Sequence, residues 1–533
     1  MRLSIRLLKL FSVLFIFYAI NSKGQDILTT SNLPIVVINT GGNCIVPDSN
    51  ITADMGIIYN GPGSVNHISN PFNNYDGKIG IRCRGNTSLS FPKKSYSVET
   101  QDSLGQNLNV SLIDLPSEND WVFYGPYSDK SLMRNALIFQ LARKLGWYAS
   151  RTKYCELILD STYQGVYVFT EKIKEDEERV DIATLSPNDT IGDELTGGYM
   201  IQVDRWDGDG WFSNFTQYTY FEYYEPDDDD ILPVQKAYIQ NYINDFEFML
   251  DTLTIWDHEL IDSSINLKSF YDYLILNELA KNVDAYRLST YMFKDKDSKD
   301  GRLTMGPIWD YNIAFGNCDY YDGFLTSGYI YSDSIYNNYA LFWFKKLMEF
   351  EPFQDSLKCR WELLRNSSLH MDSISASIDS IQWLLDEPNE RNFIKWNILG
   401  QYVWPNYFVG ETYEEEVDYL KEWIEERMAW LDNNLPGDCP TSSGSIKFTN
   451  GQLFIIYPNP FKSELRIKFN NKGNNDLQFS IFDLQGREVY QINLKDPVGN
   501  EVALSNIDIE DGLYFYRIIL NRNAATSGKI LKY

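Results

Sequence analysis

The chain has 533 residues, 44% of them hydrophobic and 15% aromatic, which is enough to bury the core of one large domain and a smaller one. It carries 47 basic and 74 acidic side chains, so its formal net charge is −27. A surface of this charge repels nucleic acid and anionic lipid, and the composition argues against general disorder.

The first 24 residues have the pattern of a secretory signal peptide. A basic start at Arg2, Arg6 and Lys9 precedes an apolar run over residues 10–20, and small residues follow it. No later run reaches the apolar length that a membrane span needs. We therefore predict that residues 1–24 are removed and that the mature chain is exported without a transmembrane segment.

Cysteine and histidine usage narrows the chemistry. The 6 cysteines permit up to three disulfides in an exported chain without fixing their connectivity. None of them forms a CxxC pair, which argues against a zinc ribbon or a thioredoxin-like site. The 3 histidines, His67, His258 and His370, lie far apart and in no recognisable motif. Carboxylate and lysine chemistry is the better expectation.

From about residue 33, LPIVVIN, KIGIRCRGNTS and FPKKSYSVET have the alternation of strands. In RGNTS, Arg84 precedes a glycine at which the chain can turn and offer backbone N–H groups and hydroxyls to an anion; a surface turn is the alternative. Lys93 and Lys94 are adjacent, so in a strand they face opposite sides, and the inward one can meet phosphate.

The next segments alternate between helices and strands. We predict a helix at about 130–145, then a hairpin from YCELILD and YQGVYVFTEKI with Glu171 at its far end, and a strand at GGYMIQVDR. The loop DRWDGDGW is acidic and Gly-rich, as in a cation site or a solvated turn. Helical periodicity follows over 234–256 and 266–282.

A second hairpin separates two aspartates. STYMFK and RLTMGPIW favour strands and KDSKDG favours a turn, so Asp284 and Asp310 lie at opposite ends of one hairpin, which can bring both carboxylates to one site. The turn misses the spacing of an EF-hand calcium loop. Asp310 lies between two aromatic residues, where an ionised carboxylate is costly unless it is paired or bound to metal. Capping a helix or pairing with an arginine are alternatives to metal binding.

The order of these parts is that of a protein-kinase core, although GxGxxG, HRD and DFG are all missing. RGNTSLSFPKKSYSV, ENDWVFYGPYSDKSLMRNAL, YQGVYVFTEKI, GGYMIQVDR and PIWDYNIAFG resemble the CotH family of atypical kinases, first known from spore-coat proteins. The resemblance runs from about residue 33 to 435. It implies an α+β, kinase-like core of antiparallel sheet plus helical lobe over residues 25–436, using ATP or another nucleoside triphosphate with Mg²⁺ or Mn²⁺.

Site roles follow from this resemblance. Asp284 is similar to the catalytic aspartate and Asp310 to the metal-binding aspartate; Lys94, or its neighbour Lys93, takes the phosphate-contacting role. Arg84 and Glu171 complete the candidate nucleotide site. Two positions depart from the family pattern: Ser289 stands where an asparagine is common and Asn312 where an acid is common, both at the expected metal site. These departures weaken the expected metal binding and leave an inactive kinase-like protein open.

The C-terminal part has a different pattern. Residues 340–435 are mostly helical, and residues 437–450 form a polar linker. Residues 451–533 contain short alternating strands, from which we predict a small all-β, immunoglobulin-like sandwich. YPNP, FDLQGREV, GLYFYRI and KILKY resemble the C-terminal sorting domain of the type IX secretion system. This implies a secreted or cell-surface protein of the Bacteroidetes that is recognised by that machinery.

Three functions remain open from the sequence. The first is a secreted kinase that phosphorylates Ser or Thr of a surface or secreted protein, with a basic, Ser-rich protein as the candidate substrate. The second is a kinase-like surface binding or structural protein without catalysis, because nucleoside triphosphate is scarce outside the cytoplasm. The third is a carbohydrate-active enzyme, which requires two carboxylates about 5 to 10 Å apart across a cleft.

Overall fold

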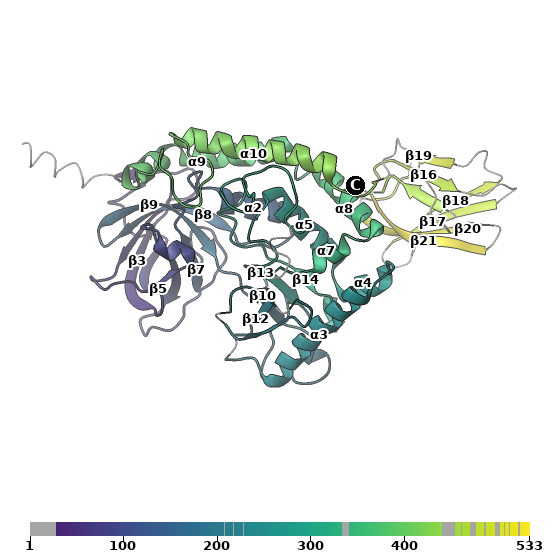
Figure 1. The fold of residues 1–533 in the computed structure, drawn as a ribbon, viewed down its shortest axis with the longest axis horizontal. Helices are drawn as coiled ribbons and strands as arrows, with labels where there is room; N and C mark the ends of the chain where they lie inside the picture. Colours follow the sequence, from purple (N-terminus) through teal and green to yellow (C-terminus); the bar gives the residue numbers. More distant parts are fainter. Residues whose placement is uncertain are drawn as a thin grey trace, which may run out of the picture. The chain divides into compact units, whose positions relative to one another are not determined.

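A computed structural model describes residues 28–439 except 207, 217, 228 and 333–339. Beyond these it describes residues 454–532 except 460, 470–475, 484–486, 496–500, 506, 511 and 521–522. The chain forms two compact units, Met1–Gly437 and Asp438–Tyr533 (Figure 1). The predicted signal peptide, and the predicted linker from residue 440 onward, lie outside the described residues. No helix in the described ranges is long and apolar enough to cross a bilayer.

The N-terminal strands close into a barrel. Its order is β2 (Ile35–Asn39), β3 (Ile51–Ile58), β5 (Tyr75–Arg84), β6 (Ser95–Gln101), β7 (Asp120–Tyr124), β9 (Thr162–Glu171) and β8 (Thr152–Leu159). Neighbours are antiparallel except β2 and β8, whose parallel pairing closes the ring. The predicted antiparallel sheet is therefore a closed barrel with one parallel pair of strands. The sequence did not indicate this closure, because β2 and β8 are too far apart in sequence for local periodicity to show that they pair. A separate ribbon joins β1 (Thr30–Ser31) to β4 (Asn66–His67).

A second sheet carries the predicted aspartate hairpin. Its order is β11 (Gly210–Phe212), β12 (Tyr220–Glu225), β10 (Tyr199–Val203), β13 (Thr290–Lys294) and β14 (Thr304–Met305). β13 and β14 pair antiparallel, with Met292 opposite Met305, which confirms the hairpin. The polar connection contains the short helix α6 (Asp297–Asp300).

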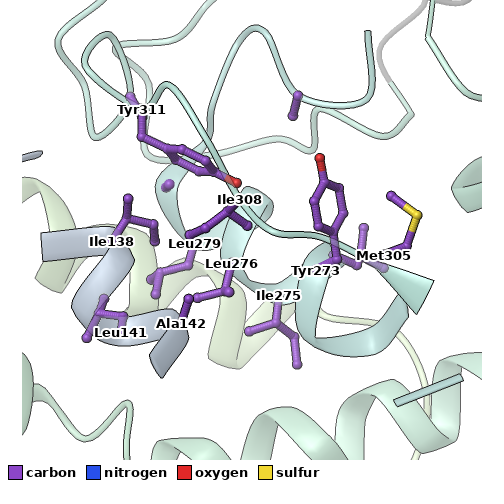
Figure 2. Close-up of a cluster of buried hydrophobic side chains, with 14 of the residues drawn as sticks. Ile138, Leu141, Ala142, Tyr273, Ile275, Leu276, Leu279, Met305, Ile308 and Tyr311 are labelled. Carbon is purple, nitrogen blue, oxygen red and sulfur yellow. The ribbon is translucent and has the colours of Figure 1, made fainter. Parts of the chain in front are cut away.

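Helices form the rest of the large unit. They are α2 (Arg134–Lys144), α3 (Pro233–Thr252), α4 (His258–Ser264), α5 (Leu267–Ala280), α7 (Trp343–Leu347), α8 (Glu351–Arg365), α9 (Met371–Lys395) and α10 (Tyr413–Asn434). The residues of α5 are almost all buried, including the polar side chains of Asp272, Asn277 and Glu278, so the helix is packed on nearly every side. In Figure 2, Ile138 and Leu141 of α2 lie beside Leu276 and Leu279 of α5. This core holds the two segments that carry the aspartates.

The C-terminal unit is all-β. β15 (Phe454–Tyr457), β16 (Glu464–Phe469) and β19 (Glu501–Ser505) form one sheet; β18 (Glu488–Lys495), β17 (Asp476–Phe482), β20 (Gly512–Leu520) and β21 (Asn523–Lys532) form another. A buried cluster includes Ile467 of the first sheet and Phe479 and Ile518 of the second. The finer prediction of an immunoglobulin-like sandwich stays a prediction.

The cysteines occur in two states. Cys359 and Cys439 are disulfide-bonded. The other four cysteines are free thiols, and of these only Cys44 is exposed. Two of the six cysteines are therefore bridged, within the limit of three disulfides that the cysteine count permits.

Candidate active site

A cleft of about 730 Å³ contains both hairpin aspartates. Its walls come from the barrel strands β6, β7 and β9, from the end of β10, and from the two loops that flank the β13–β14 hairpin. Asp284 lies in the loop before the hairpin and Asp310 in the loop after it. The hairpin therefore brings the two carboxylates to one cleft, which is the arrangement its sequence predicts.

The end of α5 positions Asp284. The helix stops at Lys281, whose left-handed conformation (φ 43°) turns the chain. The Lys281 ammonium donates to three backbone carbonyls, those of Asp322 (2.7 Å), Leu325 (3.0 Å) and Ser327 (2.6 Å). Arg287, three residues after Asp284, donates a hydrogen bond to the Asp284 carboxylate. Burial raises the pKa of Asp284, while Arg287 and then Arg205 oppose that rise.

Contacts with α2 and α5 hold the loop that carries Asp310. The Tyr311 N–H donates to the side-chain oxygen of Asn135 in α2 at 2.7 Å, and the Tyr311 hydroxyl donates to that of Asn277 in α5, also at 2.7 Å. Nε of Arg134 donates to the Ala314 carbonyl at 3.1 Å. Asp310 itself has a positive φ of 61°, a strained backbone conformation. The contacts of Tyr311 and Ala314 hold the loop in this conformation.

The environment of Asp310 disfavours its negative charge. Water reaches its side chain through the cleft, yet the surrounding protein removes much of its hydration. That burial, the neighbouring Asp284 carboxylate and, more weakly, Asp204 raise the pKa of Asp310 to about 6, against the opposing effect of Arg84 and Arg205. An ionised Asp310 therefore lacks a cation that balances it fully.

The raised pKa gives a pH-dependent stability prediction. The folded chain favours protonated Asp310, so charging this carboxyl costs stability as pH rises from 3.8 through about 6, and the full cost applies above 6. With a chelator present, Asp310→Asn should raise the melting temperature at pH 8, on the order of 1–2 °C because cleft water screens the charge. The gain should shrink below pH 6 and vanish near pH 4 in thermal melts. Asp245→Asn, an exposed change on α3, is the control and should give no such pH-dependent gain.

The RGNTS turn lies on the cleft, as its anion-binding interpretation requires. Arg84 is the last residue of β5, and its guanidinium lies 5.4 Å from the ring centre of Trp309. Gly85 has a φ of 110°, and a Cβ there would lie 1.9 Å from the Ser88 hydroxyl, so glycine is required. Residues 84–88 all line the cleft.

Three other predicted residues are not at the cleft. Lys93 is buried and donates to the Val166 carbonyl (2.6 Å) and the Asn392 side chain (2.8 Å); burial lowers its pKa well below the ordinary value. Lys94 donates to the Leu89 carbonyl at 2.5 Å. Neither lysine is among the described residues that line the cleft. The alternation argument fails for them because β6 begins only at Ser95.

Glu171 also has a structural environment. It is buried at the end of β9, where it accepts hydrogen bonds from the Arg151 side chain at 3.0 Å and lies 3.4 Å from Arg179. Within the described parts of the chain it does not line the cleft. A nucleotide-contacting role for it has no support from this geometry.

The two residues that depart from the family pattern do line the cleft. The Ser289 N–H donates to the Asp204 carboxylate at 3.1 Å, and the Ser289 hydroxyl lies 3.4 Å from the same oxygen. Asn312 is held through its backbone carbonyl, which accepts from Asn317 at 2.8 Å. In the described ranges no group of three or more His, Cys, Asp or Glu side chains is arranged to hold a metal.

Asp204 is the residue that sequence reasoning missed. It follows β10 directly, at the start of the acidic loop DRWDGDGW, and it lines the cleft beside Ser289. The acidity of that loop was the available signal. What the sequence did not indicate was which of its acids faces the hairpin.

Two family models match this chain. Residues 81–431 match the family model of the CotH kinase protein, and residues 455–532 match that of the secretion system C-terminal sorting domain. No curated protein matches the sequence.

Two solved structures show limited similarity. The proinflammatory kinase CtkA of Helicobacter pylori is 9% identical, covering 66% of this chain and 96% of that chain with a TM-score of 0.23. Dimeric latent PorU from Porphyromonas gingivalis is 20% identical, covering 15% of this chain with a TM-score of 0.14. The match spans only 9% of the PorU chain.

The two family matches define a kinase-like protein with a secretion sorting tail. The chain belongs to the CotH kinase protein family, whose model covers more than half of it. The sorting domain directs it through type IX secretion to the cell surface or beyond, and implies contact with that machinery.

Proposed function

We propose that this protein transfers the terminal phosphoryl group of a nucleoside triphosphate to Ser or Thr hydroxyls of a surface or secreted protein. The observation that carries the proposal is the convergence of Asp284 and Asp310 on one cleft, with Arg84 on the same cleft. Ionised Asp284 accepts a hydrogen bond from the acceptor hydroxyl and orients its oxygen toward the terminal phosphorus. It takes the hydroxyl proton as the new P–O bond forms and the bond to the leaving nucleoside diphosphate breaks. Arg287 holds the Asp284 carboxylate in place.

The donor set suits a hard divalent cation. Asp310, with the amide oxygen of Asn312, would hold Mg²⁺ or Mn²⁺, because such ions prefer carboxylate and carbonyl oxygens. Burial and the neighbouring Asp284 carboxylate raise the pKa of Asp310 to about 6, and a cation bound there would favour the ionised form of Asp310. When bound, the ion would neutralise phosphate charge.

The cleft has a cationic part for the phosphates of the nucleotide and an apolar part for its base. Arg84 and Arg205 offset phosphate charge, a role that the sequence had assigned to Lys94. Val122 and Val168 on the barrel wall, with Phe139 of α2, supply an apolar surface for the base. A nucleotide placed in this way spans from the barrel to the hairpin.

Arg84→Ala should therefore weaken ATP binding about 10- to 100-fold, the size expected when one charge-assisted contact is lost. Lys94→Ala is the matched control, because the Lys94 ammonium is held by the Leu89 carbonyl. It should change the affinity less than about threefold. Equilibrium titration with a fluorescent ATP analogue in the presence of Mg²⁺ measures both. Equal losses in the two variants would contradict the assignment of Arg84.

The proposed function is tested by incubating the purified mature chain with γ-labelled ATP and Mg²⁺ or Mn²⁺. Self-labelling and labelling of a basic, Ser-rich protein are followed while nucleotide is titrated in parallel. Metal-dependent binding together with transfer supports the proposal. Metal-dependent binding without transfer favours a kinase-like binding protein, an alternative that the Ser289–Asp204 contact motivates because Ser289 is already engaged. Absence of nucleotide binding under all conditions would rule out both nucleotide-dependent functions and leave a surface binding module.

A further inference from the structure

A second, smaller cavity shares the β13–β14 hairpin with the cleft. It has a volume of about 220 Å³, and we call it the hairpin pocket. Its lining comes from α2 and the segment after it, from the loop at 179–181, from α5 and from the hairpin: Ala142, Trp147, Tyr148, Arg179, Val180, Asp181, Ser269, Tyr273, Leu276, Phe293, Met305, Gly306, Pro307 and Ile308. None of these residues lines the cleft.

The wall of the hairpin pocket is mostly apolar. Figure 2 shows five of its residues: Ala142 from α2, Tyr273 and Leu276 from α5, and Met305 and Ile308 from β14 and the segment that follows it. Such a wall favours an apolar molecule over water, because water needs two or more polar partners to enter a cavity. The volume is below the roughly 300–1,000 Å³ of pockets for drug-sized ligands, and above the about 150 Å³ that is enough for benzene in an engineered cavity. A ligand of about one substituted ring matches it.

One polar side chain on this wall is incompletely satisfied. Arg179 is fully buried, and neither its Nε nor its Nη2 has a hydrogen-bond acceptor among the described residues. Its two Nη atoms lie near carboxylates: Nη1 is 3.1 Å from Asp176 and Nη2 is 3.4 Å from Glu171. The charge of the guanidinium is therefore already balanced. What Nε lacks is an acceptor oxygen, and a neutral one suits it best, since Asp181 on the same wall would repel an anion.

We propose that the hairpin pocket is a binding site for a small neutral molecule of about one ring, whose carbonyl or similar oxygen accepts a hydrogen bond from Nε of Arg179. The apolar body of the ligand lies against α5 and Met305. This site is separate from the proposed nucleotide cleft, so the proposal does not depend on kinase activity.

Three ring compounds of similar size separate the contribution of the neutral hydrogen-bond acceptor from those of the apolar ring and of charge. Benzamide has a ring and a neutral carbonyl, toluene has no acceptor, and benzoate carries a charge. Titration of the full mature chain, followed by ligand-observed NMR and by fluorescence, since Trp147 lines the pocket, should show saturable binding of benzamide. Toluene and benzoate should bind at least about tenfold more weakly, because each loses the neutral acceptor.

Two matched variants locate the binding. Ala142→Leu adds three carbons into the pocket and should abolish benzamide binding, whereas Ala429→Leu adds the same atoms at an exposed position of α10 and should leave binding unchanged. Met305→Phe is a second filling variant if Ala142→Leu does not fold by thermal melt. Benzamide binding that survives pocket filling, no saturable binding to the unmodified chain, or equal affinities for the three probes would overturn the proposal.

Discussion

Asp310→Asn is expected to abolish the metal-dependent part of ATP binding, whereas Asp284→Asn should leave ATP affinity within about threefold and stop phosphoryl transfer. Under the proposed roles, Asp310 acts on the nucleotide through the metal, and Asp284 acts on the acceptor hydroxyl alone. Loss of a positioned base reduces turnover by about 10²–10⁴-fold. The measurements are fluorescent-ATP titration with and without Mg²⁺, and phosphoryl transfer in the same buffer.

The two asparagine variants are each other's control, since each removes one carboxyl charge from the same cleft. Asn312→Asp completes the series: an added carboxylate beside Asp310 should tighten Mn²⁺ binding, because divalent affinity rises with ligand charge. If the Asp310 and Asp284 variants lose ATP binding equally, the division of roles is wrong. If Asp310→Asn retains metal-dependent binding, the metal lies elsewhere.

Glu278→Ala is expected to cost about 3–5 kcal/mol of unfolding free energy, the range for removing one partner of a buried ion pair. Glu278, in α5, accepts from the N–H groups of Ile330 (3.0 Å) and Tyr331 (2.9 Å), and lies 3.3 Å from the guanidinium of Arg427 in α10. Without it, the Arg427 charge stays buried and unbalanced. Urea unfolding of the variant measures the loss.

Glu425→Ala, at an exposed position on α10, is the control and should cost less than about 0.5 kcal/mol. The double variant Glu278→Leu with Arg427→Met should be more stable than Glu278→Ala, because it removes both charges and keeps the volume. A single-variant cost no larger than that of the control would mean that the pair does not hold α5 to α10.

Local patterns predicted the parts of the site that lie close together in sequence. Asp284, Asp310 and the strands between them belong to one hairpin, so periodicity and turn composition were enough to bring them together. The RGNTS turn was predicted in the same way, because its glycine, Gly85, has the positive φ of 110° that such a turn requires. The buried face of α10 also follows from helical spacing, including its one arginine, Arg427.

Residues whose orientation depends on distant partners were not predictable from local patterns. Lys93 donates a hydrogen bond to Asn392 of α9. Asp204, just after β10, accepts a hydrogen bond from Ser289, just before β13. Barrel closure was unpredictable for the same reason, because β2 and β8, which pair to close the barrel, are separated in sequence by most of the other barrel strands. In each case the missing information is a tertiary contact, which single-sequence periodicity does not contain.

The parallel pairing that closes the barrel has a consequence for how the exported chain folds. Ile35 of β2 pairs with Glu156 of β8, so β2 must wait for β8 to form before either strand has its final neighbour. Contacts of such high sequence separation slow folding, because chain entropy is lost long before the contact forms. Once closed, the barrel exposes no strand edge, and so offers no template for cross-strand aggregation. During export the barrel strands are therefore open to aggregation chiefly before closure, and afterwards the topology of the native barrel protects them.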